Sequence, residues 1–247
     1  LNLRFSGWHR YRATNTITSV YKGGQLTGDV LSGKVFAWLP EGRSLFRDKR
    51  IPRENLNGLL VPRTGMSAVL YDLTGIGGRW AQDPPQNAEV LAFEPGADLD
   101  RSHTRLQNWR GWRHDRWVSF YHDGGPIVVA DQAMGPDRGP AALAWQFAAR
   151  GEIKDSRLRL RDDANPAEVV FLSVEPLGQD ALMIARHADA QTISYTINNG
   201  QARLVTIFLF GPWVGADVVL DSTGQTLHIV KGDKRIAQPL PWTTETP

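Results

Sequence analysis

Short runs that alternate apolar and polar residues recur along the whole chain, separated by Gly, Asn and Asp. Clear examples are 14–21 (TNTITSVY), 88–93 (AEVLAF), 157–161 (RLRLR) and 226–230 (TLHIV). Successive side chains of a β-strand point to opposite faces, so this period predicts strands with one buried face. Many short strands without intervening helices favour antiparallel packing over a parallel βαβ sheet. We therefore predict an all-β fold with little helix, a large antiparallel β-sandwich of the supersandwich kind.

One hairpin is specified in detail. Residues 115–133 hold DRWVSFY, the turn HDGG and PIVVADQA, and Gly supplies the positive φ that hairpin turns require. The sequence NNGQ at 198–201 indicates a second hairpin, between the runs on either side of it. The apolar run 67–73 (SAVLYDL) also predicts a strand.

The segment 140–150 (PAALAWQFAAR) admits two interpretations. Its alanines favour a helix, whereas Leu143, Trp145 and Phe147 at every second position are typical of a one-sided strand. We prefer the strand.

The 247 residues contain no linker that would split them, so we expect a single β-sandwich domain over 1–247. The chain begins at Leu1, without an initiator Met, and we expect it to be a piece of a longer protein. The longest apolar run, 202–215, is broken by Gly211 and Pro212, so no membrane span is predicted.

The net charge, the absence of cysteine and the absence of several sequence motifs argue against some classes of function. The net charge is only +2, which gives no case for a nucleic-acid partner. Without cysteine there is no disulfide, no thiolate metal site and no cysteine nucleophile. The sequence holds no Walker A, His-Glu-x-x-His or Gly-x-Ser-x-Gly motif, and no two of its six histidines are spaced as metal ligands. We expect neither a cofactor nor a metal.

Two histidines lie among arginines and polar residues, His9 in GWHRYR and His103 in DRSHTRL. An imidazole in such surroundings suits acid–base chemistry, so both are candidate catalytic residues. The alternative is a surface histidine or one that makes only structural hydrogen bonds.

Aromatic and basic residues are also mixed in WRGWRHDRW, from Trp109 to Trp117. Aromatic rings stack on sugar rings, and Arg pairs with uronate or sulfate. Trp109, Trp112 and Arg113 are therefore candidate saccharide contacts, with core packing as the alternative for the two Trp.

Three other Trp lie within or beside apolar strands and are expected to pack in the core: Trp117, Trp145 and Trp213.

A family resemblance rests on two stretches. The hairpin DRWVSFYHDGGPIVVADQA, followed by ALAWQF, resembles the C-terminal β-sandwich of heparinase II/III-like polysaccharide lyases. The stretch 11–26 (YRATNTITSVYKGGQL) resembles the early strand of that domain, in which an Arg precedes His-Asn-Thr. By this likeness Arg12 and Asn15 would contact substrate, while Thr14 occupies the position of the His and cannot act as a base near neutral pH.

The resemblance implies a bacterial enzyme that cleaves acidic polysaccharide by β-elimination, located in the periplasm, at the cell surface or outside the cell. In that family a helical toroid supplies much of the machinery, so the resemblance implies that this chain is the C-terminal part of a longer protein. We therefore expect this chain to bind acidic polysaccharide or support a cleft for it, with lyase activity only alongside a separate, preceding helical domain. The alternative is a non-catalytic structural or protein-interaction module of a bacterial cell-envelope protein.

Overall fold

The computed structural model describes residues 2–4, 16–19, 38–39, 43–44, 58–61, 65–74, 87–122, 124–136, 141–147, 151–160, 167–175, 182–186 and 191–242. These residues form antiparallel sheets with one short α-helix, which confirms the predicted all-β fold.

Eight strands make the largest sheet: β6 (Asn87–Glu94), β7 (Leu99–Trp109), β8 (Trp112–Tyr121), β9 (Ile127–Met134), β11 (Gly151–Lys154), β12 (Arg157–Leu160), β13 (Ala167–Ser173) and β16 (Gln201–Phe210). Their order is β11-β12-β13-β16-β9-β8-β7-β6. A four-stranded sheet contains β5 (Gly58–Leu60), β10 (Ala141–Phe147), β14 (Leu182–Arg186) and β15 (Gln191–Ile197), in the order β14-β15-β10-β5.

A three-stranded sheet follows the 3-10 helix Gly211–Trp213 and contains β17 (Asp217–Leu220), β18 (Thr226–Lys231) and β19 (Lys234–Pro239). Two further pairs are β1 (Asn2–Arg4) with β2 (Thr16–Ser19), and β3 (Trp38–Leu39) with β4 (Arg43–Ser44).

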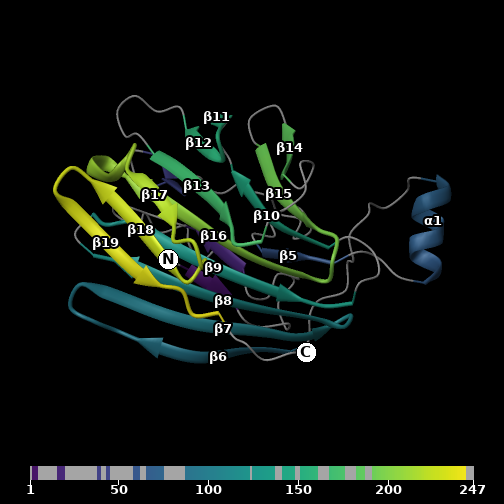
Figure 1. The fold of residues 1–247 in the computed structure, drawn as a ribbon. Helices are drawn as coiled ribbons and strands as arrows, with labels where there is room; N and C mark the ends of the chain where they lie inside the picture. Colours follow the sequence, from purple (N-terminus) through teal and green to yellow (C-terminus); the bar gives the residue numbers. More distant parts are fainter. Residues whose placement is uncertain are drawn as a thin grey trace.

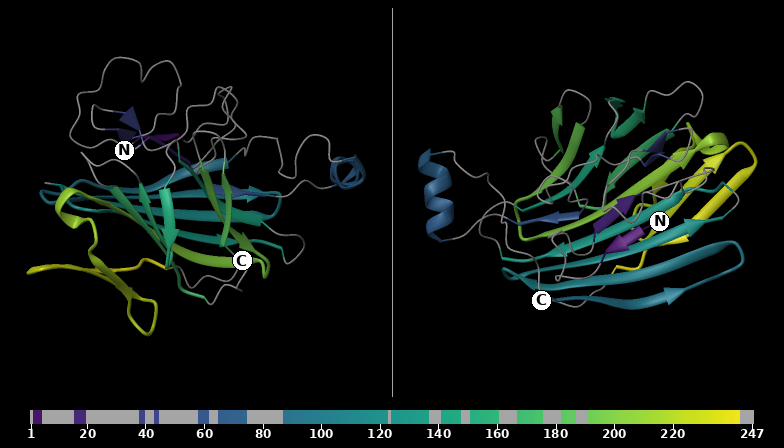
Figure 2. Two further views of the ribbon diagram at one scale, coloured as in Figure 1. Left: turned by 90° about the horizontal axis from the view of Figure 1, so that it is seen from above. Right: turned by 180° about the vertical axis from the view of Figure 1, so that it is seen from behind.

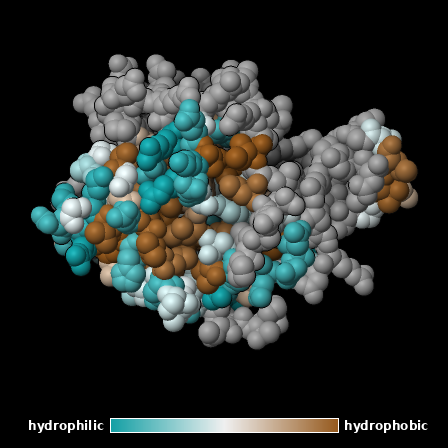
Figure 3. Space-filling model, turned by 45° about the horizontal axis from the view of Figure 1, so that its top comes forward, coloured by the Kyte–Doolittle hydropathy of each residue, from teal (hydrophilic) through white to brown (hydrophobic). Residues whose placement is uncertain are grey.

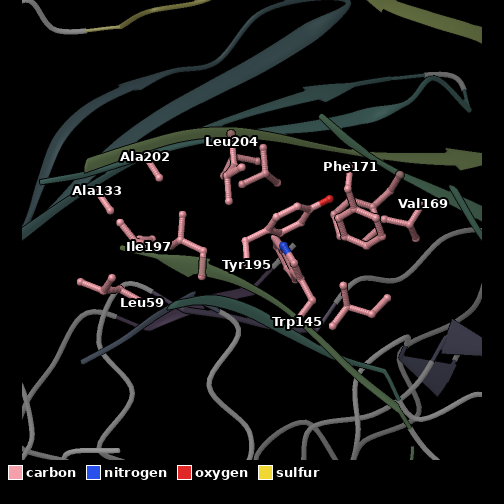
Figure 4. Packing of buried hydrophobic residues seen from close by; sticks show 14 of the residues in the cluster. Leu59, Ala133, Trp145, Val169, Phe171, Tyr195, Ile197, Ala202 and Leu204 are labelled. Carbon is pink, nitrogen blue, oxygen red and sulfur yellow. The ribbon is translucent and has the colours of Figure 1, made fainter. Parts of the chain in front are cut away.

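The eight-stranded sheet is the middle of three layers (Figures 1 and 2). We call its inner face the one that packs against the four-stranded sheet, through a core in which the Trp145 indole donates to Thr206 Oγ1 at 3.1 Å. Figure 4 shows this inner core, with the Tyr195 ring pointing toward Phe171. The outer face packs against the three-stranded sheet, where Leu227 and Ile229 are fully buried.

The sequence of strand β16 is apolar nearly without interruption, and its position in the middle layer explains why. Phe208 belongs to the inner core, whereas its neighbour Ile207 belongs to the outer core. Because both faces of this strand are covered, both sets of alternating side chains must be apolar. The strand therefore resembles those of fully buried sheets.

The structure confirms the preferred strand in 140–150, as β10, and the hairpin in 115–133, in which Phe120 of β8 is paired with Ile127 of β9. The hairpin predicted across 198–201 is wrong. The chain does reverse there, but β15 pairs with β10 and β14, whereas β16 pairs with β9 and β13. Turn residues specify the reversal and not the sheet that each arm joins.

The strand predicted at 67–73 is also wrong, because Met66–Thr74 forms helix α1. Its apolar residues recur every three or four positions, which places them on one face of a helix. A search for alternating apolar and polar residues does not detect this spacing. Met66, Val69, Leu70 and Leu73 are all exposed, and this apolar stripe lies at the right edge of Figure 3, on the helix that projects at the right of Figure 1. Within the described residues, no helix has the length and apolar character needed to cross a membrane.

Candidate functional site

Strands β7 and β8 place a row of polar side chains on the outer face of the eight-stranded sheet. Their register sets His103 opposite Trp117 and Arg105 opposite Asp115. Since alternate residues share a face, Arg113 of β8 lies on the same side as Asp115 and Trp117.

Asp115 is the centre of this row, and its side chain is completely buried. Its carboxylate accepts hydrogen bonds from Nε of Arg113 at 2.6 Å, Nε of Arg105 at 2.7 Å and Nε2 of His103 at 2.8 Å. Burial by itself would raise the pKa of Asp115, but the bonds from His103 and the two arginines outweigh it and lower that pKa to about 2. The carboxylate is therefore ionised across the physiological range. We call these four residues the Asp115 cluster.

Asp115 also orients His103. A carboxylate only accepts, so Nε2 of the imidazole carries the proton, and the other ring nitrogen of the neutral form is an acceptor. The ring stacks on Trp117, with centroids 4.4 Å apart and planes 19° apart, and Trp117 meets Trp242 edge-on at 6.2 Å. The hydrogen bond to Asp115 and the stacking on Trp117 together fix the plane of the imidazole.

A pocket of about 410 Å³ opens beside His103, between the outer face of β6–β8 and the end of β19. Its polar lining includes Glu94, Arg101, His103, Ser119 and Gln238, and its apolar lining includes Trp117, Pro239 and Pro241. Figure 1 shows β19 crossing from the three-stranded sheet toward these strands.

Gln238 connects the two sides of this pocket. Its amide nitrogen donates to Ser119 Oγ at 2.9 Å, and its amide oxygen accepts from the Tyr121 hydroxyl at 3.1 Å. The pocket wall contributed by β19 is thus tied to β8 by two hydrogen bonds.

A second charged group lies on the inner face, between the sheets. Asp131 accepts from His114 Nε2 at 2.8 Å and from Arg116 Nε at 2.6 Å, and all three side chains are buried. Burial would raise the pKa of Asp131, but the charge of Arg116 and the bond from His114 outweigh it and lower that pKa to about 2. For His114 burial dominates and lowers the pKa. The Arg116 guanidinium also lies over Trp145, 5.1 Å from the ring centroid. All three side chains are shielded from solvent, so removal of one of them should destabilise the fold.

The sugar contacts predicted for Trp109 and Trp112 are not available in this structure, because both rings are buried in the inner core. Strict alternation from the buried Leu106 would put Trp109 on the outer face. A β-bulge between Leu106 and Trp109 turns the indole inward instead, opposite Trp112.

Arg113 is one-fifth exposed and bonded to Asp115, so it forms part of the cluster and does not line the pocket. His103 is the predicted catalytic candidate that the structure places beside a pocket. The other candidates, His9, Arg12 and Asn15, lie outside the described residues, as does Thr14.

Of the three Trp expected in the core, Trp145 and Trp213 are buried. Trp117 is only partly buried, since one side of it borders the pocket. Sequence reasoning missed Arg101, Ser119 and Gln238 as site residues. Arg101 stands two residues before His103, so the spacing that places both on one face of a strand was the available signal.

Among the described residues, no group of three or more His, Asp or Glu side chains is arranged to hold a metal ion.

Comparison with known proteins finds similar structures but no matching sequence. No family model matches the sequence, and no curated protein matches it. The solved structure of a heparinase III gene product superposes with a TM-score of 0.53 at 12% identity, covering 81% of this chain and 35% of that one. The described sandwich therefore has a heparinase-like fold.

Two other solved structures superpose on a smaller share of this chain. A crystal structure of heparinase III has a TM-score of 0.48 at 15% identity, with 64% of this chain and 28% of that chain covered. The heparan sulfate lyase of Pedobacter heparinus has a TM-score of 0.48 at 14% identity, with 66% and 29% covered. The chain spans about a third of the length of these neighbours.

Proposed function

We propose that this chain is the β-sandwich region of a heparinase-like protein and binds an acidic saccharide in the pocket beside His103. The observation that carries the proposal is the convergence of Arg101 and His103 on one pocket wall. Arg binds a carboxylate through two parallel hydrogen bonds, and an imidazole offers a further polar contact. The volume of about 410 Å³ is in the range of small-molecule sites and suits one or two sugar rings.

The Asp115 cluster supports this proposal through its charge. Asp115 is buried and shared among three donors, so a ligand meets the donors and not the carboxylate. Arg105 and Arg113 together exceed the single negative charge of Asp115, and Arg101 adds another positive charge at the pocket. On the outer face, β7 and β8 therefore carry more positive than negative charge, while Glu89 and Glu94 of the neighbouring β6 lie opposite Arg105 and Arg101.

We further propose that the complete protein is a polysaccharide lyase, which requires a helical domain that supplies the other catalytic residues. Within the described part of this chain, His103 is the candidate proton acceptor, because its second ring nitrogen is the acceptor when Nε2–H is bonded to Asp115. A polysaccharide ligand would place the protein in the bacterial periplasm, at the cell surface or outside the cell.

Calorimetric titration with a glucuronate-containing tetrasaccharide tests the binding. We expect Arg101→Gln to weaken binding about tenfold or more through loss of a charge-assisted contact. The control is Lys154→Gln, because Lys154 is exposed on β11 at the opposite edge of the same sheet. Absence of binding by the wild-type chain, or equal loss in both variants, would refute the proposal.

A protein-interaction module is the second candidate, and the exposed apolar stripe of α1 favours it. Four apolar side chains on one side of a helix form a surface of the kind that packs against a partner. Sedimentation of the chain alone and of a Leu70→Gln/Leu73→Gln variant tests whether this stripe drives association.

A further inference from the structure

The two edges of the eight-stranded sheet differ in their protection against pairing with another chain. At one edge lies β11, which has four residues and ends with Lys154. At the other lies β6, the outermost strand at the bottom of Figure 1, which has eight residues and contains neither Lys nor Pro. Short length, Lys and Pro are features that keep edge strands from pairing. Among the described residues β6 pairs only with β7, so its other edge is open to a further strand.

Apolar side chains of β6 are exposed beside this open edge. Three of them are more than two-fifths exposed: Val90 (53%), Leu91 (41%) and Phe93 (65%). Val90 lies opposite Thr104 of β7, and Phe93 lies opposite Ser102. Because Ser102 and Thr104 flank His103, which is on the outer face, Val90 and Phe93 share the inner face. A β-bulge adds one residue to β6 between them and so brings both to the same side.

The outer face of β6 carries two exposed carboxylates. Glu89 lies opposite Arg105, which is itself bonded to Asp115. Glu94 lies opposite Arg101. An added strand would lie about 4.8 Å from β6 and about twice as far from the arginines of β7, whose charge salt screens more strongly at that distance. The glutamates therefore repel an acidic strand and favour Lys or Arg at the outward positions of a new strand.

We propose that the edge of β6 binds an extended segment of a partner protein in which basic residues alternate with apolar ones. The partner's backbone would extend the sheet, and its apolar side chains would cover Val90 and Phe93. Its Lys or Arg side chains would lie beside Glu89 and Glu94. A second copy of this chain fits less well, because pairing two β6 strands gathers four carboxylates on one face. Val90 and Phe93 do not line the saccharide pocket, so this inference does not depend on the proposed function.

Fluorescence anisotropy of labelled peptides, each as long as β6, tests the proposal with the whole chain. The first probe alternates Lys with Val, and the second alternates Glu with Val. The third contains the same Lys and Val residues as the first, arranged in two blocks. Wild type should bind the first probe about tenfold more tightly than either of the others. Only the first probe places Lys on one face of a strand and Val on the other.

Phe93→Lys tests the apolar contact. It places a charge where the partner's Val side chains would pack and should weaken binding of the first probe about tenfold or more. Phe93 is largely exposed, so this variant is expected to fold, and a thermal melt checks it. Val219→Lys is the control, because Val219 is 58% exposed on β17, an edge strand of the three-stranded sheet. It should leave binding unchanged.

Glu89→Lys tests the charge. It should largely abolish the preference for the Lys probe over the Glu probe, because one attractive and one repulsive pair then oppose each other. Glu152→Lys, at an exposed position of β11, should leave that preference unchanged. Equal binding of the three probes by wild type, or unchanged binding in Phe93→Lys, would overturn the proposal. A dimer of the chain alone that Phe93→Lys dissociates in sedimentation would also overturn it, by assigning this edge to a second copy.

Discussion

Nε2 of His103 donates to Oδ1 of Asp115 at 2.8 Å, which links a side chain of the pocket to a carboxylate closed to solvent. The same carboxylate holds Arg105 and Arg113. Orientation of the pocket wall and stability of the sheet therefore depend on one buried group.

Replacing Asp115 by Asn should lower both stability and binding. The change removes the buried counter-charge of two arginines and leaves the imidazole free to turn, and breaking a buried ion pair costs about 3 kcal/mol. Urea unfolding measures the stability loss, and titration with the glucuronate probe measures binding at a temperature where the variant is folded. Arg113→Gln is the comparison, because it removes one donor and keeps the carboxylate. Unchanged stability in Asp115→Asn would contradict the structure.

Acidification should destabilise the protein in two stages. Burial lowers the pKa of His114 below its ordinary value of 6.5, so the unfolded chain takes up this proton first and stability falls as the pH drops below about 6.5. The lowered pKa values of Asp131 and Asp115, both about 2, favour the folded state above their ordinary value of 3.8. That contribution, about 2 kcal/mol per carboxylate, is lost as the pH falls from about 4 to about 2.

Urea unfolding at intervals from pH 8 to pH 3 measures this dependence. His114→Gln should remove the first stage, since Gln does not titrate, whereas replacing the exposed His228 by Gln should leave it in place. An unchanged slope between pH 6.5 and pH 5 in His114→Gln would show that His114 is not the group responsible.

Trp112 should matter for stability and not for binding. Trp112→Ala leaves a large cavity in the inner core and should cost about 3–5 kcal/mol. Gly135→Ala tests the same packing from the other side, because a Cβ there would lie 2.2 Å from Cδ2 of Trp112, and the clash should cost about 1–3 kcal/mol. Thermal melts give the stability, and the glucuronate probe should bind both folded variants as it binds wild type. A binding defect without a stability defect would return Trp112 to the saccharide site.

Replacing apolar residues of the stripe on α1 should leave the stability of the folded chain nearly unchanged. Leu70 and Leu73 are 55% and 79% exposed, so replacing both by Gln removes little buried surface. The melting temperature should change by less than about 2 °C, as for other exposed positions, and binding of a dye specific for apolar surface should decrease. A large drop in melting temperature would mean that the stripe packs against this chain.

The sequence was sufficient for the fold class, because β8, β9 and β16 carry strong patterns of alternation or continuous apolar runs. It was insufficient for β7, the strand that carries the site. Its outer positions are Arg101, His103 and Arg105, and polar residues lie between them, so neither face shows an apolar period. The residues of β7 that form the candidate site are thus the same ones that prevent its detection by a pattern based on hydrophobicity.

The pocket was also beyond sequence reasoning. It depends on Ser119 and Gln238, which lie 119 positions apart and meet only because the three-stranded sheet folds back on the outer face. The position of Trp109 depends on one bulge, and a bulge inserts a residue without a distinct signal in this stretch.

The middle sheet has a consequence for synthesis of the chain on the ribosome. Strand β9 is paired with β8 on one side and with β16 on the other, so a nascent chain carries β9, which is buried along its whole length in the folded protein, well before β16 exists. Pairings between distant segments form slowly and leave such strands exposed to other nascent chains. Strands β6 to β9 can pair in the order of synthesis, but the sheet is completed only after β16 is made, so production of this protein should benefit from slow expression at low temperature.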